Sequence, residues 1–103
     1  MKKIIKHVTN IKNIYTYFEF TEYEDWDDFD ALSLILKNKM RCKVIDILEG
    51  IWSRHCTFER DGFVFKLLYH EDCGNCLCNQ NKKDEAYYGQ LEAIANEVLQ
   101  FLK

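Results

Sequence analysis

Residues 52–70 read WSRHCTFERDGFVFKLLYH and contain the clearest fold signal in the chain. Two alternating apolar and polar runs flank Asp61-Gly62, a dipeptide that supplies the positive φ angles of a tight type I′ turn. Counting outward from that turn predicts the register: Arg60 opposite Phe63, Phe58 opposite Phe65, Cys56 opposite Leu67, Arg54 opposite Tyr69, and Ser53 opposite His70. The stretch therefore predicts an antiparallel hairpin.

The two faces of this hairpin differ in polarity. One face is expected to face the core and carries Trp52, Cys56, Phe58, Phe63, Phe65, Leu67 and Tyr69. The other face suits contact with water and carries Ser53, His55, Thr57, Glu59, Lys66 and His70. The aromatic face is large enough to cover a layer of helices.

Further elements are predicted on both sides of the hairpin. Residues 14–20 alternate as a strand does, residues 42–48 are short and β-branched, and lysines surround a possible edge strand within residues 1–12. A helix over 25–40 gathers its apolar side chains within about 120° of arc: Trp26, Phe29, Leu32, Leu36 and Met40. A second helix over 84–102 has an apolar stripe of its own, and Asp84 can cap its start.

The predicted order is strand, strand, helix, three strands and a helix, within a single domain over residues 1–103. Hairpins rather than parallel crossovers connect the strands. The fold class is therefore α+β, with an antiparallel sheet of about 4–5 hairpin-connected strands and both helices on one face.

Residues 70–78 read HEDCGNCLC and form the most conspicuous cluster of potential metal ligands. The ligands of a zinc site here would be His70, Cys73, Cys76 and Cys78. Strong zinc motifs bring a second ligand pair from distant sequence, and we expect Cys76 and Cys78 to point to opposite faces of a strand. We therefore favour a structural turn without cofactor, and keep a zinc-binding or thiol regulatory role as the alternative.

Several function classes are disfavoured by the sequence. We predict no catalytic residues. The neighbours His55 and Cys56 should point to opposite faces of a strand and so cannot form a nucleophilic pair, and we expect a protein that is not an enzyme. A net charge of −3 argues against nucleic acid as the main partner. No apolar run approaches the roughly 18–20 residues of a membrane span, so we expect no membrane partner and a cytoplasmic location.

The strongest unusual feature is acidic. Residues 19–30 read EFTEYEDWDDFD and hold seven carboxylates without a basic residue. Single-sign surfaces of this kind raise association rates with oppositely charged partners. The predicted partner-binding residues are Glu22, Tyr23, Glu24, Asp27, Asp30 and Leu34. The alternative is a solvated helix start whose aspartates merely complement the helix dipole.

Small size, acidity, one α+β domain and this carboxylate patch resemble the small bacterial immunity proteins of contact-dependent growth inhibition systems. The resemblance implies an antitoxin that binds and neutralises a cognate protein toxin, often a basic nuclease. It implies that the acidic surface takes the place of nucleic-acid phosphates at the toxin, and that the protein is a monomer until it binds.

Overall fold

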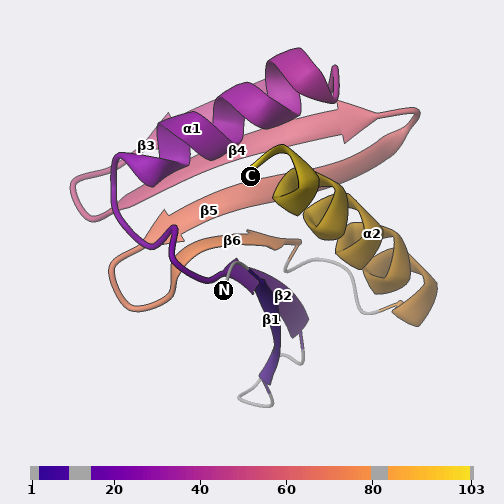
Figure 1. The fold of residues 1–103 in the computed structure, drawn as a ribbon, viewed down its shortest axis with the longest axis horizontal. Helices are drawn as coiled ribbons and strands as arrows, with labels where there is room; N and C mark the ends of the chain where they lie inside the picture. The colour runs from indigo at the N-terminus through magenta and orange to yellow at the C-terminus, as the bar shows by residue number, and fades with distance from the viewer. Residues whose placement is uncertain (1–2, 10–14, 80–83, 103) are drawn as a thin grey trace.

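The predicted hairpin lies within the sheet, with neither of its strands at an edge (Figure 1). The structure is a computed structural model that describes residues 3–9, 15–79 and 84–102. Strands β4 (Ser53–Arg60) and β5 (Phe63–His70) pair in the predicted register, including Ser53 with His70. Asp61 and Gly62 have φ angles of 54° and 80°, as a type I′ turn requires. The hairpin prediction is confirmed.

Replacing Gly62 with valine should lower the free energy of unfolding by about 1–3 kcal/mol, the scale for a strained backbone position. The loss comes from the backbone, because a Cβ at Gly62 would meet no atom within 4 Å. Denaturant unfolding measures it. Gly89→Val is a control for the added side chain, because Gly89 lies in helix α2 and its Cβ position is also open. Equal losses in the two variants would contradict the turn assignment.

Within the described residues the sheet has six antiparallel strands in the order β1-β2-β6-β5-β4-β3, rather than the predicted four or five. The remaining strands are β1 (Ile4–Thr9), β2 (Tyr15–Phe20), β3 (Lys43–Glu49) and β6 (Gly74–Cys78). The sequence predicts a turn with cysteines where the structure has β6. It is a strand because it lies between β2 and β5 and hydrogen-bonds to both. The pairing of β2 with β6 also shows that hairpins alone do not connect the sheet.

The first predicted helix begins and ends differently from the prediction of 25–40. It consists of α1 (Asp28–Leu34) followed by one π-helical segment, η1 (Ile35–Lys39). Residues 25–27 instead form turns, in which the amide of Asp28 donates to the carbonyl of Asp25 at 3.1 Å. The second helix, α2 (Glu85–Phe101), agrees with the prediction, and the Asp84 carboxylate accepts from the amide of Ala86 at 2.9 Å.

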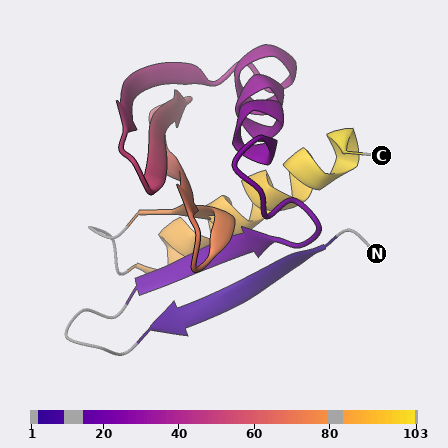
Figure 2. The ribbon, with the colours of Figure 1, turned by 90° about the vertical axis from the view of Figure 1, so that its left-hand side faces the viewer.

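The core lies between the helices and one face of the sheet. Side chains from both helices and from the inner face of the strands form one buried cluster, which includes Phe18, Phe58, Phe65, Leu77, Leu32, Leu36, Leu91 and Val98. Figure 2 shows the layers turned by 90°. Two predicted core residues lie outside this cluster. Trp52 precedes β4 in the β3–β4 connection and is exposed, and Trp26 precedes α1 and is partly exposed.

No helix among the described residues is long and apolar enough to cross a membrane.

Candidate functional site

One end of the sheet carries an excess of carboxylates. Because neighbouring strands are antiparallel, β2, β3 and β5 end where β4 and β6 begin, so the connections over 21–27, 50–52 and 71–73 meet at this end. We call it the acidic end, at the left of Figure 1 and facing the viewer in Figure 2. Its carboxylates are Glu22, Glu24, Asp25, Asp27, Asp28, Asp30, Glu49, Glu71 and Asp72. The cations that the structure describes there are Lys3 and Arg54.

The opposite end of the sheet carries positive charge. Four exposed cations lie where η1 ends and β3 begins: Lys37, Lys39, Arg41 and Lys43. Glu59, which is paired with Lys43, and Asp61 lie at this end too, so its charges are mixed, whereas those of the acidic end are mostly negative. Such an uneven distribution orients an approaching charged partner more strongly than the net charge of −3 suggests.

Arg54 organises the centre of the acidic end. Its guanidinium donates to both oxygens of Asp30, at 3.0 and 2.8 Å, in a bidentate pair. It also donates to Glu49 Oε1 from Nε and Nη2, at 3.0 and 2.7 Å, and to the carbonyl of Trp26 at 3.2 Å. The same group lies over the rings of Trp26 and Phe29, with its carbon 5.0 and 4.4 Å from their centroids. One side chain of β4 therefore joins α1, β3 and the chain before α1.

This arrangement changes the role predicted for Asp30. The hydrogen bonds that Arg54 donates to Asp30 lower the pKa of Asp30 and raise the pKa of Arg54. The Arg54 side chain is only 10% exposed, whereas those of Asp30 and Glu49 are 61% and 49% exposed. Asp30 therefore stays ionised and visible to solvent, but its orientation is fixed by an internal partner.

The structure spreads the six predicted partner-binding residues along a strip. Glu24 lies over β6, because a Cβ at Gly74 would be 3.1 Å from Glu24 Cβ, and a hydrogen bond with Glu19 raises its pKa. Tyr23 is half-buried and packs against the core, and its hydroxyl donates to the carbonyl of Leu102 at 3.2 Å. Asp27 and Leu34 are exposed, Leu34 on the same helix as Asp30. The strip runs from β6 to β4 around Tyr23, whose side chain anchors the loop.

Buried Asn75 fixes this strip to the sheet. Its side-chain amide donates to the carbonyls of Tyr23 and Asp25, at 2.9 and 3.0 Å. The residue is fully buried within β6. The loop that carries the carboxylates is thereby held in one place, which lowers the entropy lost when a partner binds it.

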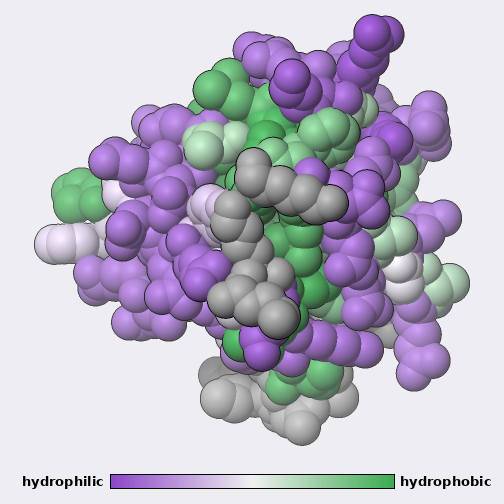
Figure 3. Space-filling model, in the orientation of Figure 1, coloured by the Kyte–Doolittle hydropathy of each residue, from purple (hydrophilic) through white to green (hydrophobic). Residues whose placement is uncertain are grey.

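An apolar surface that the sequence did not predict lies beside the carboxylates. Ile51 and Trp52 are 82% and 68% exposed in the connection that follows Glu49. Edge strand β3 adds further exposed apolar side chains: Ile45, Ile47 and Leu48. Figure 3 shows a hydrophobic projection among hydrophilic residues at this end. The signal was the run VIDILEGIW over 44–52, whose apolar residues do not alternate and so cannot all face one core.

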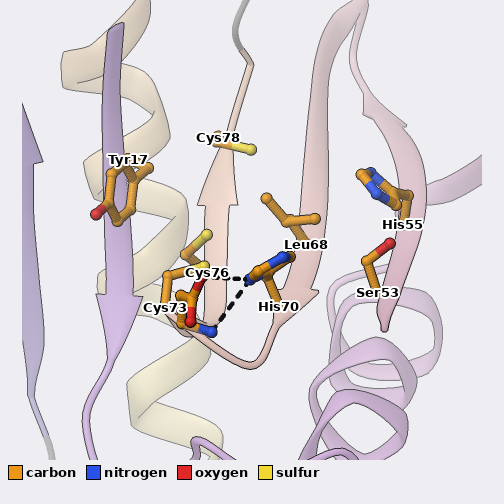
Figure 4. A pocket seen from close by; sticks show the side chains of 9 residues that line it. Tyr17, Ser53, His55, Leu68, His70, Cys73, Cys76 and Cys78 are labelled. Atoms are coloured by element: carbon orange, nitrogen blue, oxygen red, sulfur yellow. Dashed lines mark hydrogen bonds and ion pairs between the residues drawn. The ribbon is translucent and has the colours of Figure 1, made fainter. Parts of the chain in front are cut away.

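The open face of the sheet, away from the helices, contains a pocket of about 340 Å³ (Figure 4). Strands β2, β6, β5 and β4 form its floor, and its lining is Tyr17, Cys76, Cys78, Leu68, His70, Ser53 and His55, with Cys73 and Asp72 from the β5–β6 turn. Cys76 and Cys78 both line it, so the expectation that they point to opposite faces is wrong. Residues two apart in a strand share a face.

The candidate zinc ligands do not assemble into a metal site. The His70 ring is engaged with its own turn: its Nδ1 accepts from the amide of Asp72 at 3.1 Å and lies 3.6 Å from the Asp72 carboxylate. Across the described part of the chain, no group of three or more His, Cys, Asp or Glu side chains is arranged to hold a metal ion. Cys73, Cys76 and Cys78 instead line the same pocket as free thiols.

Adding a chelator should leave the melting temperature of the protein unchanged. A structural zinc ion contributes folding free energy directly, so its removal lowers the melting temperature of a zinc protein sharply. Thermal unfolding with and without EDTA, together with elemental analysis of protein purified without added zinc, tests this expectation. A bound equivalent of zinc and a large fall in melting temperature would restore the zinc alternative.

The histidine and cysteine neighbours in β4 lie on opposite faces, as expected. His55 lines the open-face pocket, and Cys56 is buried in the core. Burial raises the pKa of the Cys56 thiol and lowers that of the His55 ring, so neither is activated by the other.

Comparison of the chain with protein-family models, curated proteins and solved structures finds no match.

Proposed function

We propose that this protein is an immunity protein that binds and neutralises a basic bacterial toxin domain of the nuclease type. It acts by binding rather than by catalysis, in the cytoplasm, and is a monomer until it meets the toxin. The observation that carries the proposal is the acidic end, where exposed carboxylates border the exposed side chains of Ile51 and Trp52.

The carboxylates supply steering. A surface of one sign accelerates the encounter with a basic partner and suppresses encounters with acidic ones. The positive residues at the far end of the sheet, such as Lys39 and Arg41, repel that partner and favour approach by the acidic end. A basic nuclease cleft that binds phosphates has the complementary charge.

The apolar side chains supply the binding energy. Interfaces draw most of their affinity from a few central residues, among which tryptophan is enriched, while charges at the rim contribute mainly to the rate of association. Trp52 is a large, exposed aromatic side chain only three residues after Glu49. Arg54 in turn joins Glu49 to Asp30. We therefore place Trp52, Ile51 and Asp27 at the centre of the interface, and Glu22 and Glu24 at its rim.

Arg54 supports this use of the surface because it fixes the carboxylates before binding. Asp30 and Glu49 share one guanidinium, and their outward parts remain exposed. A lysine or arginine of the toxin can contact these oxygens without first ordering them, so less conformational entropy is lost.

The test is protection of growing cells from the toxin domain encoded beside this gene. Cells that express that domain should grow when they also express this protein, and the purified proteins should form a complex whose association slows as salt is raised. Glu22→Lys should slow association with little effect on dissociation. The proposal fails if no neighbouring gene encodes a basic toxin domain, or if the two proteins do not bind.

A further inference from the structure

Three thiols meet at the β6 side of the open-face pocket. Cys73, Cys76 and Cys78 all line it, and Cys76 comes between the other two in the sequence. Figure 4 shows the three side chains along one strand and the turn before it. All five cysteines of the chain are free thiols in this structure, and Cys42 and Cys56 are buried in the core on the other face.

The three pocket thiols differ in access. Cys73 is half-buried in the turn between β5 and β6, whereas Cys76 and Cys78 are almost completely buried. Interaction with Cys76 lowers the pKa of Cys73, and interaction with Cys73 raises the pKa of Cys76 well above its usual value. The accessible thiol is therefore more readily ionised than Cys76, whose side chain lies beside it in the lining of the same pocket. This is the arrangement of an attacking thiol with a resolving partner.

We propose that Cys73 and Cys76 form a reversible disulfide when the protein meets a low-molecular-weight disulfide such as oxidised glutathione. The Cys73 thiolate attacks one sulfur of that disulfide, which breaks its S–S bond, forms a mixed disulfide on Cys73 and releases one thiolate. Cys76 gives up its proton to solvent and attacks the Cys73 sulfur, which releases the second thiol. The two protein thiols are oxidised and the small disulfide is reduced to two thiols.

The backbone favours this pair over Cys76 and Cys78. Residues two apart on one face of an extended strand are separated by roughly 6–7 Å at their Cα atoms, at or beyond the upper end of the disulfide range. Cys73 instead lies in a turn, where Gly74 with a φ of 67° bends the chain back towards β6. The two intervening residues, Gly74 and Asn75, give the spacing of a Cys-X-X-Cys motif. This site does not depend on the proposed toxin binding.

The experiment measures thiols and mass after the reduced full-length protein is mixed with oxidised glutathione. Wild-type protein should lose two thiols and the mass of two hydrogen atoms, with no glutathione retained. Cys76→Ser should stop at a stable mixed disulfide with one glutathione on Cys73. Cys78→Ser and the matched core control Cys42→Ser should both behave like the wild type.

Cys73→Ser provides the variant that does not disturb the core, because Cys73 is only half-buried and lies outside the core cluster. It should react at least tenfold more slowly than wild type, because the remaining thiols are buried. The proposal is overturned if wild type retains glutathione, if Cys73→Ser reacts as fast as wild type, or if peptide mapping finds Cys76 joined to Cys78. Circular dichroism of each variant confirms that it is folded.

Discussion

Replacing Arg54 with methionine lowers the free energy of unfolding by about 2–4 kcal/mol, judged from the net value of hydrogen bonds to charged groups. Methionine keeps much of the side-chain length but removes the bonds to Asp30, Glu49 and the Trp26 carbonyl, together with the guanidinium contacts to two aromatic rings. The loss stays below that of a fully buried ion pair, because Asp30 and Glu49 are about half exposed and become hydrated.

Arg60→Met is the matched control. Arg60 donates to Glu97 at 3.0 Å, but both side chains are about one-third exposed, so its loss should cost about 1 kcal/mol or less. Denaturant unfolding of the two variants gives the comparison. Equal losses would mean that the Arg54 cluster adds no more than an ordinary surface pair does.

The same comparison has a pH signature. Arg54 lowers the pKa of Asp30 from its usual 3.8, so the folded state favours the ionised carboxylate more than the unfolded state does. The stabilisation is complete above the unfolded pKa and is lost as the pH falls through the lower, folded pKa. The stability difference between wild type and Arg54→Met should therefore be constant near neutral pH and shrink below about pH 4.

The sequence predicted the parts of this fold that local patterns determine. The Asp61-Gly62 turn and the alternation of residues 53–70 sufficed for the full hairpin register, because side chains two apart share a face. The Asp84 cap was also predictable because it is local: the amide that it caps belongs to Ala86, two residues away. Strand β6 was not predicted, because its residues Gly74 and Asn75 have weak strand propensity and its partner β2 is distant in sequence.

The candidate site was predictable only in its charge. The carboxylates of residues 22–30 follow directly from composition, but the pairing of Asp30 with Arg54 joins segments that no local pattern connects. Trp52 was assigned to the core because alternation was extended one residue beyond the start of β4. The Cys76 and Cys78 error was one of periodicity, and applying the strand period correctly would have avoided it.

Replacing Trp52 with alanine should weaken toxin binding by about 2–4 kcal/mol, the loss typical of a central aromatic residue. That loss corresponds to a fall in affinity of about 30- to 1,000-fold. It should appear mainly as faster dissociation, because Trp52 carries no charge and does not steer the encounter. Stability should change little, since the side chain is largely exposed.

Two controls make the binding measurement specific. Val8→Ala removes an exposed apolar side chain from β1, far from the β3–β4 connection in the strand order, and should leave both rates unchanged. Asp27→Lys reverses a charge beside α1 and should slow association. Glu92→Lys makes the same charge change at an exposed position of α2 and should slow association less. If Trp52→Ala and Val8→Ala bind alike, the toxin docks elsewhere.

The position of β2 beside β6 also sets the order in which the chain completes its fold during synthesis. β2 ends at residue 20, but the strand that it pairs with begins only at residue 74. A ribosome extends the chain from its N-terminus at about 5–20 residues per second, so the first two strands emerge seconds before their neighbour. During that interval Phe18 and Phe20, which are fully buried in the finished protein, remain open to water and to chaperones. Newly made chains are therefore vulnerable to aggregation and proteolysis until residues 74–78 and then helix α2, which packs against β2, have emerged.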